Sequence, residues 1–202
     1  MKELLIAFGA VVLMISCSQK NPFFQEWDTP YGTAPFSQIK TEHYLPAFKE
    51  GIKQEKAEIQ AIIDCKEAPT FENTVAAYDR AGALLAKVSG VFFNLSESDS
   101  TPEMQAIEEE VMPLITEAEN EIFMNEDMFK RVKAVYDNME GLTREQHMVT
   151  KKLYQAFERN GVGLDSEGKK RFAEISTRLA TLSQKFGQNL LAENNAFKDA
   201  TG

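Results

Sequence analysis

The sequence predicts an all-α protein, in which an array of about six amphipathic helices follows an irregular N-terminal tether. Apolar residues recur at three- and four-residue spacing through most of the chain, which is the period of a helix that buries one face. Ser, Thr, Asn and Asp residues that suit helix N-caps precede these stretches. No stretch shows the alternation of apolar and polar residues that is typical of a strand.

Length and charge limit the class of protein. The chain has 202 residues, of which 43% are hydrophobic, and this is enough for one domain with a sizeable core. Its net charge is −9. Nucleic acids and anionic lipids are also negative, so the charge argues against both as general partners.

Residues 1–16 are expected to be a lipoprotein signal peptide. Lys2 precedes an apolar run of 12 residues, 4–15, which is too short to span a bilayer. The run Leu-Met-Ile-Ser-Cys that ends at Cys17 resembles a bacterial lipobox, so Cys17 is the expected lipid attachment site. The alternative is a plain secretory signal in which Cys17 is incidental. We therefore expect a lipid-anchored protein of the bacterial cell envelope. Residues 18–20 lack the acidic run that directs some bacterial lipoproteins to the cell surface, so the protein is expected to face the periplasm.

Residues 17–40 are expected to be a tether, and the helical domain to span residues 41–197. The tether contains Pro22, Pro30 and Pro35 but also several aromatic residues, so residues 23–40 should lie as irregular chain on the domain surface. The first helix is expected to begin near Thr41, with Pro46 in its first turn. Its apolar face comprises Leu45, Phe48, Ile52, Ile59, Ile62 and Ile63.

The chain is expected to fold back at Pro69. Proline disfavours the helical conformation in the residue before it, and Thr70 with Asn73 forms a capping-box pattern. The second helix is therefore expected to run from residue 71 to about residue 95, before a polar loop at 96–100. Gly82 and Gly90 lie inside it, which indicates either close approach of a neighbouring helix or a flexible joint.

Three helix starts and one kink are expected in the middle of the chain. Thr101 and Pro102 suit the start of the third helix, and Pro113 should kink it. Its many glutamates indicate a solvated face, or, as a sharper alternative, attraction of peptide amino termini. The fourth helix is expected from Asn125 to Gly141. The fifth begins with a capping box at Thr143 and stops at residues 160–161.

The last helix is expected to begin after Asp165 and to run to about Ala192. Its apolar positions are nearly a heptad, which is compatible with a free coiled coil or with a long helix packed in the array. The packed helix is the interpretation favoured here, because the apolar pattern covers fewer than four heptads. These positions are Phe172, Ile175, Leu179, Leu182, Phe186 and Leu190.

No catalytic residue and no metal ligand is predicted in this chain. A zinc peptidase site needs two histidines one helical turn apart with a glutamate between them, but the only histidines, His43 and His147, are far apart in sequence. They are expected to be surface or cap residues. Cys65 lacks a neighbouring histidine that would activate it, and it is expected to be a small buried residue. The basic run 169–171 is expected to be a solvated first turn rather than a clamp for peptide carboxylates.

Several motifs carry a resemblance to a known family. Pro-Thr-Phe-Glu-Asn-Thr at 69–74, Asn-Pro-Phe-Phe at 21–24, His-Tyr-Leu-Pro-Ala-Phe at 43–48 and Glu-Gln-His at 145–147 are similar to the N-terminal helical region of thimet oligopeptidase and peptidyl-dipeptidase (Dcp-type) zinc metallopeptidases. The resemblance spans about residues 21–197. The tail at 198–202 departs from the family pattern. A truncated gene, a shifted reading frame or a trimmed chain would each explain this departure.

The resemblance implies a function for a larger protein. It implies that the zinc-binding His-Glu-x-x-His segment lies outside this chain, that the helical region helps to wall a channel for short peptides, and that the chain alone is inert and holds no cofactor. Short peptides are then partners only together with the missing catalytic domain. The alternative is a stand-alone helical lipoprotein that binds a peptide or protein through an uncovered apolar surface.

Overall fold

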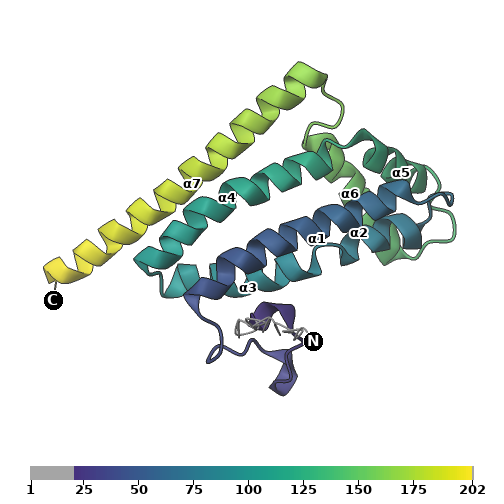
Figure 1. Cartoon of the computed structure of the whole chain (residues 1–202). Coiled ribbons are helices and arrows are strands. Elements are labelled where there is room, and N and C mark those ends of the chain that lie inside the picture. Colours follow the sequence, from purple (N-terminus) through teal and green to yellow (C-terminus); the bar gives the residue numbers. More distant parts are fainter. Residues whose placement is uncertain (1–20, 202) are drawn as a thin grey trace, which may run out of the picture.

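The computed structural model describes residues 21–201 and confirms the all-α prediction (Figure 1). Every regular element in this range is helical. Short 3-10 turns occur at Pro22–Phe24, Pro30–Gly32 and Thr41–His43 (η1, η2 and η3). The longer elements are α1 (Tyr44–Asp64), the π-helical turn η4 (Phe71–Ala76), α2 (Ala77–Arg80), α3 (Ala83–Ser98), α4 (Pro102–Phe123), α5 (Glu126–Tyr136), α6 (Arg144–Arg159) and α7 (Ser166–Thr201).

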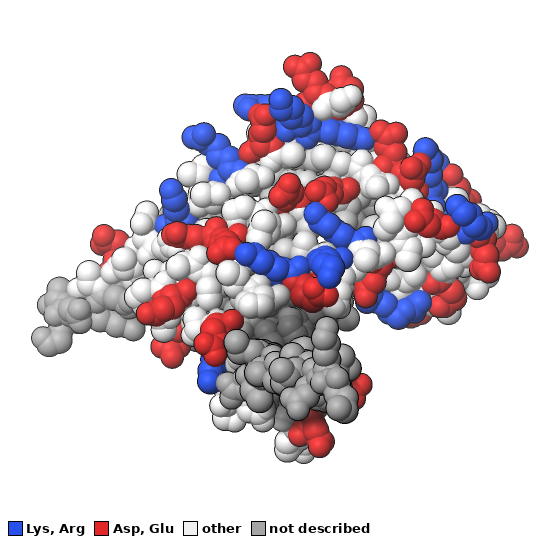
Figure 2. Space-filling view, in the orientation of Figure 1, with Lys and Arg blue, Asp and Glu red and all other residues white. Residues whose placement is uncertain are grey.

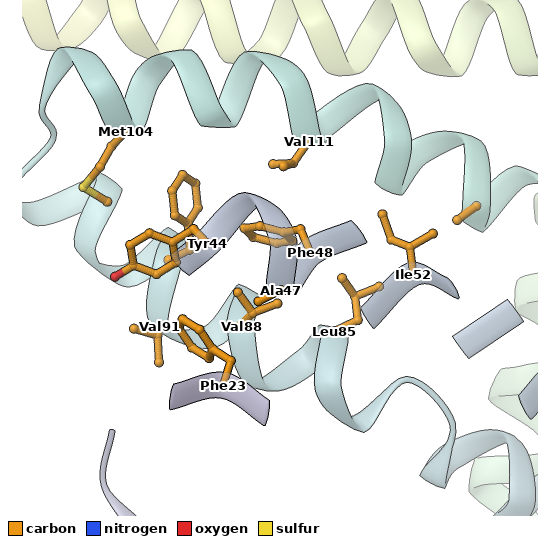
Figure 3. Close-up of a cluster of buried hydrophobic side chains, with 12 residues drawn as sticks. Phe23, Tyr44, Ala47, Phe48, Ile52, Leu85, Val88, Val91, Met104 and Val111 are labelled. Carbon is orange, nitrogen blue, oxygen red and sulfur yellow. The ribbon is translucent and has the colours of Figure 1, made fainter. Parts of the chain in front are cut away.

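Helix α1 is shared by two hydrophobic clusters, one at each end of the body. The first cluster lies between the N-terminal half of α1, α3 and α4 (Figure 3). In it Phe48 and Phe92 meet edge to face at 5.3 Å between ring centroids. The second cluster joins the C-terminal half of α1 to η4, α5 and α6, and Phe157 is fully buried in it. Helix α4 also contributes to both clusters, through Val111 and Ile122. The two clusters therefore form one continuous body.

The N-terminal segment is more than irregular chain on the surface, because Phe23 is buried in the first cluster. Trp27 Nε1 donates to the carbonyl of Pro22 at 3.0 Å. Lys87 of α3 donates to the carbonyls of Phe23 and Gln25 at 3.3 and 2.6 Å, and its ammonium lies 4.2 Å from the centroid of the Trp27 ring. These contacts fix residues 21–27 against α3.

The prediction of one continuous second helix is wrong. It is interrupted at Ala81 and Gly82, where Gly82 has φ +73° and its N–H donates to Glu58 Oε2 at 2.8 Å. A positive φ favours glycine and is not helical, so Gly82 marks a break rather than a helix interior. Gly90 has nothing within 4 Å of an added Cβ, so no helix approaches it. The helix then continues to Ser98, into the predicted polar loop.

Most of the predicted helix starts are confirmed by their capping bonds. Asn73 N donates to Thr70 Oγ1 at 3.1 Å, and Thr70 N donates back to Asn73 Oδ1 at 2.8 Å. Thr101 and Thr143 cap α4 and α6 as predicted, and α4 runs through Pro113. Helix α5 starts after Asn125 but ends at Tyr136, five residues before Gly141.

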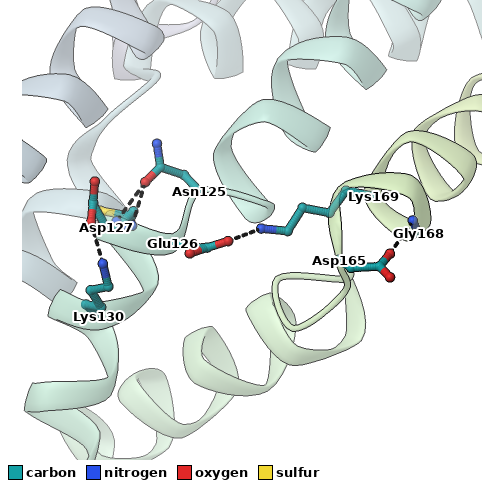
Figure 4. A network of polar contacts seen from close by, with 8 residues as sticks. Asn125, Glu126, Asp127, Lys130, Asp165, Gly168 and Lys169 are labelled. Carbon is teal, nitrogen blue, oxygen red and sulfur yellow. Dashed lines mark hydrogen bonds and ion pairs between the residues drawn. The ribbon is translucent and has the colours of Figure 1, made fainter.

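The starts of α5 and α7 are joined by an ion pair (Figure 4). Asn125 caps α5 and Asp165 caps α7, the latter by accepting from Gly168 N at 2.7 Å. Lys169 Nζ lies 2.7 Å from Glu126 Oε1, and this hydrogen bond lowers the pKa of Glu126. Lys169 is therefore an anchor for α7 rather than the solvated side chain that the sequence predicted.

A pair of glycine substitutions tests the packing of α1 on α3. A Cβ at Gly51 would lie 2.9 Å from the backbone of Leu85, so Gly51→Ala should destabilise the protein by about 1–3 kcal/mol. Gly90 lies inside α3 in open space, so Gly90→Ala should stabilise it by about 0.5–1 kcal/mol. Chemical unfolding monitored by circular dichroism measures both. Equal effects of the two substitutions would contradict the close approach at Gly51.

Candidate functional site

The predicted lipid attachment site, Cys17, lies outside the described residues, as does the predicted signal peptide at 1–16. The two histidines lie on different elements. His43 is buried in η3, where its Nδ1 accepts from Lys40 N at 3.0 Å, and its carbonyl accepts from Asn21 Nδ2 at 2.7 Å. His147 is exposed on α6. His43 thus has the predicted capping role but in a buried position, and His147 is a surface residue as predicted.

Neither a metal centre nor a membrane span is found within residues 21–201. In this range no three His, Cys, Asp or Glu side chains are placed to hold a metal ion. No helix in it combines the length and the apolar character that crossing a bilayer requires. Cys65 is partly buried at the end of α1, where its carbonyl, rather than its thiol, takes part in a polar cluster.

That polar cluster is built around Arg131 of α5, a buried cation that the sequence analysis did not single out. Its guanidinium donates to the carbonyls of Cys65 and Glu67 at 2.9 and 3.3 Å. It also donates to Asn73 Oδ1 at 3.2 Å and Thr74 Oγ1 at 3.4 Å. Neutral acceptors therefore satisfy most of its donors, and the residues around the Pro69 turn are held against α5.

A groove of about 650 Å³ lies where α1, α3, α4 and α7 come together. Apolar side chains such as Leu85, Phe93 and Ile115 form much of its wall. Three carboxylates, those of Glu55, Glu108 and Glu119, also line it. A groove with this lining has a negative potential and favours cationic over anionic groups.

Burial changes the titration of these acidic groups. It raises the pKa of Glu55, and the carboxylates of Glu119 and Glu58 raise it further. Burial likewise raises the pKa of Glu119 and of Glu108, the latter also through repulsion by Glu97 and Glu109. The pKa of Tyr78, behind the groove, rises to about 12 because of burial and then of Glu55 and Glu119. The carboxylates of Glu55 and Glu119 are thus close enough to repel one another, and the ammonium of Lys56 offsets part of this effect on the pKa of Glu55.

Helix α7 turns its apolar face away from the body, whereas the sequence analysis expected that face to be packed. It packs mainly on α4, and the side chains that α7 itself contributes to the grooves between the two helices are small, polar or charged, with Ile175 as the apolar exception. Its apolar side chains Ile175, Leu179, Leu182, Phe186 and Leu190, called the α7 stripe below, are instead 51–69% exposed. The prediction that this helix packs in the array is confirmed by its contact with α4, but the expectation that these five residues form the packed face is wrong. Phe172, the sixth predicted apolar position, is half-buried. An exposed apolar row of this length marks an interaction surface.

The described residues do not bring a nucleophile and a histidine together. No thiol or hydroxyl has a histidine as its hydrogen-bond partner among the bonds of residues 21–201. The features that the chain does present are the acidic groove and the α7 stripe. The sequence contained a signal for Arg131, which falls in the spacing of the buried Met128, Val132 and Val135, but no signal for the exposure of the stripe.

Comparison with known proteins identifies peptidases as relatives. No family model matches the chain. Dipeptidyl carboxypeptidase of Escherichia coli (strain K12) is 36% identical over 178 residues, which cover 87% of this chain and 26% of that protein. The Salmonella typhimurium protein of the same name matches to the same extent. Oligopeptidase A of Escherichia coli is 25% identical over 165 residues, or 81% of this chain and 24% of that protein.

These similarities confirm the resemblance drawn from the motifs. The chain belongs to the family of dipeptidyl carboxypeptidase and oligopeptidase A, the thimet oligopeptidase family. It spans about a quarter of the length of these curated relatives.

The raised pKa of Glu55 gives a pH-dependent prediction. The folded state holds the Glu55 proton more tightly than the unfolded state does, so stability falls as pH rises through the raised pKa. Glu55→Gln should therefore raise the melting temperature at about pH 7 and have no stabilising effect at about pH 4, where the wild-type carboxyl is largely protonated. Thermal unfolding at both pH values measures this.

The control for Glu55 is Glu50 on the same helix. Glu50 is only partly exposed, but hydrogen bonds from Gln54 and Lys53 lower its pKa, so Glu50→Gln should not stabilise the protein at neutral pH. A stabilisation by Glu55→Gln that is equally large at both pH values would contradict the electrostatic explanation.

Proposed function

We propose that this chain is the N-terminal helical region of a zinc peptidyl-dipeptidase or oligopeptidase that degrades short peptides. The similarity to dipeptidyl carboxypeptidase over 87% of the chain carries the proposal. The catalytic zinc and its His-Glu-x-x-His ligands then belong to a part of the enzyme outside these 202 residues. The chain alone neither binds zinc nor hydrolyses peptides.

In this role the helical body forms part of the wall of a channel that admits short peptides. A wall must be rigid, and the two hydrophobic clusters that share α1 supply that rigidity. The negative groove between α4 and α7 is a feature of the same body, and its charge favours the amino terminus of a peptide over its carboxylate.

We further propose that Cys17 carries the lipid that anchors the enzyme in the bacterial cell envelope, on the periplasmic side. The support is the apolar run before Cys17 and the small residue Ser16 next to it. Acyl chains contribute about 0.8 kcal/mol for each buried methylene, so two or more chains give a stable anchor.

A second candidate function is a stand-alone helical lipoprotein that binds a peptide or protein. The exposed α7 stripe favours it, because an uncovered apolar surface can serve a partner as well as a catalytic domain.

A chimeric enzyme separates the two functions. Residues 21–197 replace the matching segment of Escherichia coli dipeptidyl carboxypeptidase, and peptide hydrolysis is measured with and without a metal chelator. The chimera should retain chelator-sensitive kcat/KM within about tenfold of the parent enzyme, a difference of about 1.4 kcal/mol. The 202-residue chain should show no cleavage with zinc added. A folded but inactive chimera, or cleavage by the isolated chain, would contradict the proposal.

The anchor is tested by intact mass. After expression in a bacterium that processes lipoproteins, the mature protein should begin at Cys17, carry acyl mass and fractionate with membranes. Cys17→Ser should remove the acyl mass and the membrane association. A wild-type protein without lipid mass would instead identify residues 1–16 as a plain secretory signal.

A further inference from the structure

Helix α7 is attached to the body through its less apolar side. Ala173, Thr177, Ala180 and Gln184 line the grooves between α7 and α4. The side-chain nitrogens of Gln184 and Gln188 are buried there without a hydrogen-bond partner. A helix that completed its packing in this body would turn its apolar row inward and its amides outward. The present arrangement indicates that the apolar row has another partner.

The α7 stripe lies away from these grooves, except that Ile175 at its start also lines the groove beside the C-terminal half of α4. Its spacing of three and four residues places all five side chains in one row along successive turns. The exposed fraction of Phe186 is 69% and that of Leu179 is 63%, although α7 contains 36 residues and could bury them in a helical array. In Figure 1 the whole length of α7 lies at one edge of the molecule, with α4 on one side only.

We propose that the α7 stripe is the docking face for the remaining polypeptide of the full-length enzyme, and this rests on the function proposed above. The relatives are about four times as long as the segment that they share with this chain, so they contain ample polypeptide to cover the stripe. An apolar row that stays exposed in the shared segment is covered when that polypeptide packs on it.

The charges beside the stripe define the chemistry of the occupant. Arg171, Arg178 and Lys185 follow one another at seven-residue intervals, so they lie along the edge of the stripe that borders α4. Arg171 and Arg178 also line the groove toward α4. Lys and Arg side chains are visible along the outer edge of the molecule over α7 in Figure 2. Among the ion pairs of the described residues, only Arg171 of these three has a partner, Glu174 of α7 itself. The occupant therefore presents apolar side chains bordered by acidic ones.

The same charges argue against a second copy of this chain as the occupant. In an antiparallel pair of α7 helices the edges of like type face one another, so Arg178 and Lys185 of one copy would lie near the same basic residues of the other. A lipid surface is disfavoured by the net charge of −9. The experiments below distinguish a second copy and a lipid surface from the proposed occupant.

The test compares one double variant with one single variant, each in the 202-residue chain and in the chimera. Leu182→Glu with Phe186→Glu disrupts the stripe, and Val149→Glu is the control, because Val149 is an exposed apolar residue on α6. In the 202-residue chain both variants should leave the melting temperature within about 2 °C of wild type, since the substituted side chains are exposed. In the chimera the stripe variant should reduce the yield of folded, active enzyme at least tenfold, and the control should not.

The outcomes are distinct. A chimera that is active with the wild-type segment and indifferent to the stripe variant overturns the docking face but leaves the proposed function standing. An inactive wild-type chimera counts against the proposed function itself. Equal damage by the stripe variant and the Val149 control overturns the docking face, because the effect is then not specific to the stripe.

Two measurements on the 202-residue chain test whether a second copy or a lipid surface occupies the stripe instead. Sedimentation equilibrium should show a monomer, and flotation with vesicles of phosphatidylethanolamine and phosphatidylglycerol should show no binding that depends on the stripe, after Cys17→Ser removes the proposed anchor. Dimerisation that Leu182→Glu with Phe186→Glu abolishes would assign the stripe to a second copy. Vesicle binding that the same variant abolishes would assign it to lipid. Either result overturns the proposal.

Discussion

The buried guanidinium of Arg131 is the interaction on which the arrangement of the helices depends. A buried cation is costly unless its donors are satisfied, and here the acceptors come from the end of α1 and from the start of η4. Asn73 accepts from Arg131 through the same Oδ1 that completes the Thr70 capping box. The turn at Pro69, the start of η4 and the face of α5 are thus fixed by one side chain.

This constraint sets how the rest of the body assembles. Because α5 is held at the end of α1, its apolar side chains Met128, Val132 and Val135 meet Ile59 and Ile62 and form the second cluster. Helix α1 continues from there into the first cluster, where Gly51 lets α3 approach closely. Helix α7 differs from these elements, since an ion pair at its start and a small, polar side along α4 attach it to the body.

Sequence patterns predicted the parts of this fold that depend on neighbouring residues. Caps at Thr70, Thr101, Thr143 and Asp165 were predictable because each is a bond between a side chain and a backbone N–H three residues away. The break at Gly82 was not, because a glycine with positive φ and a glycine inside a helix look alike in sequence. The bond from its N–H to Glu58, 24 positions away, decides between them.

The candidate site was predictable to a smaller extent. The motifs identified the family, and the histidine spacing gave no zinc site in the chain. Periodicity showed that α7 is amphipathic, but it could not show which surface the apolar row contacts, because that depends on the rest of the enzyme. The buried role of Arg131 was open to prediction from its place among apolar residues, but its acceptors lie 57 to 66 positions away.

The most direct test of this account is native-state hydrogen exchange on the 202-residue chain. Amides of α1, η4 and α5 should exchange together in the slowest unit, because Arg131 and the second cluster couple them. Amides in the second half of α7 should exchange at least about tenfold faster, since one polar side alone holds that helix. Equal protection of α7 and α1 would contradict the claim that the body is complete without the apolar row of α7.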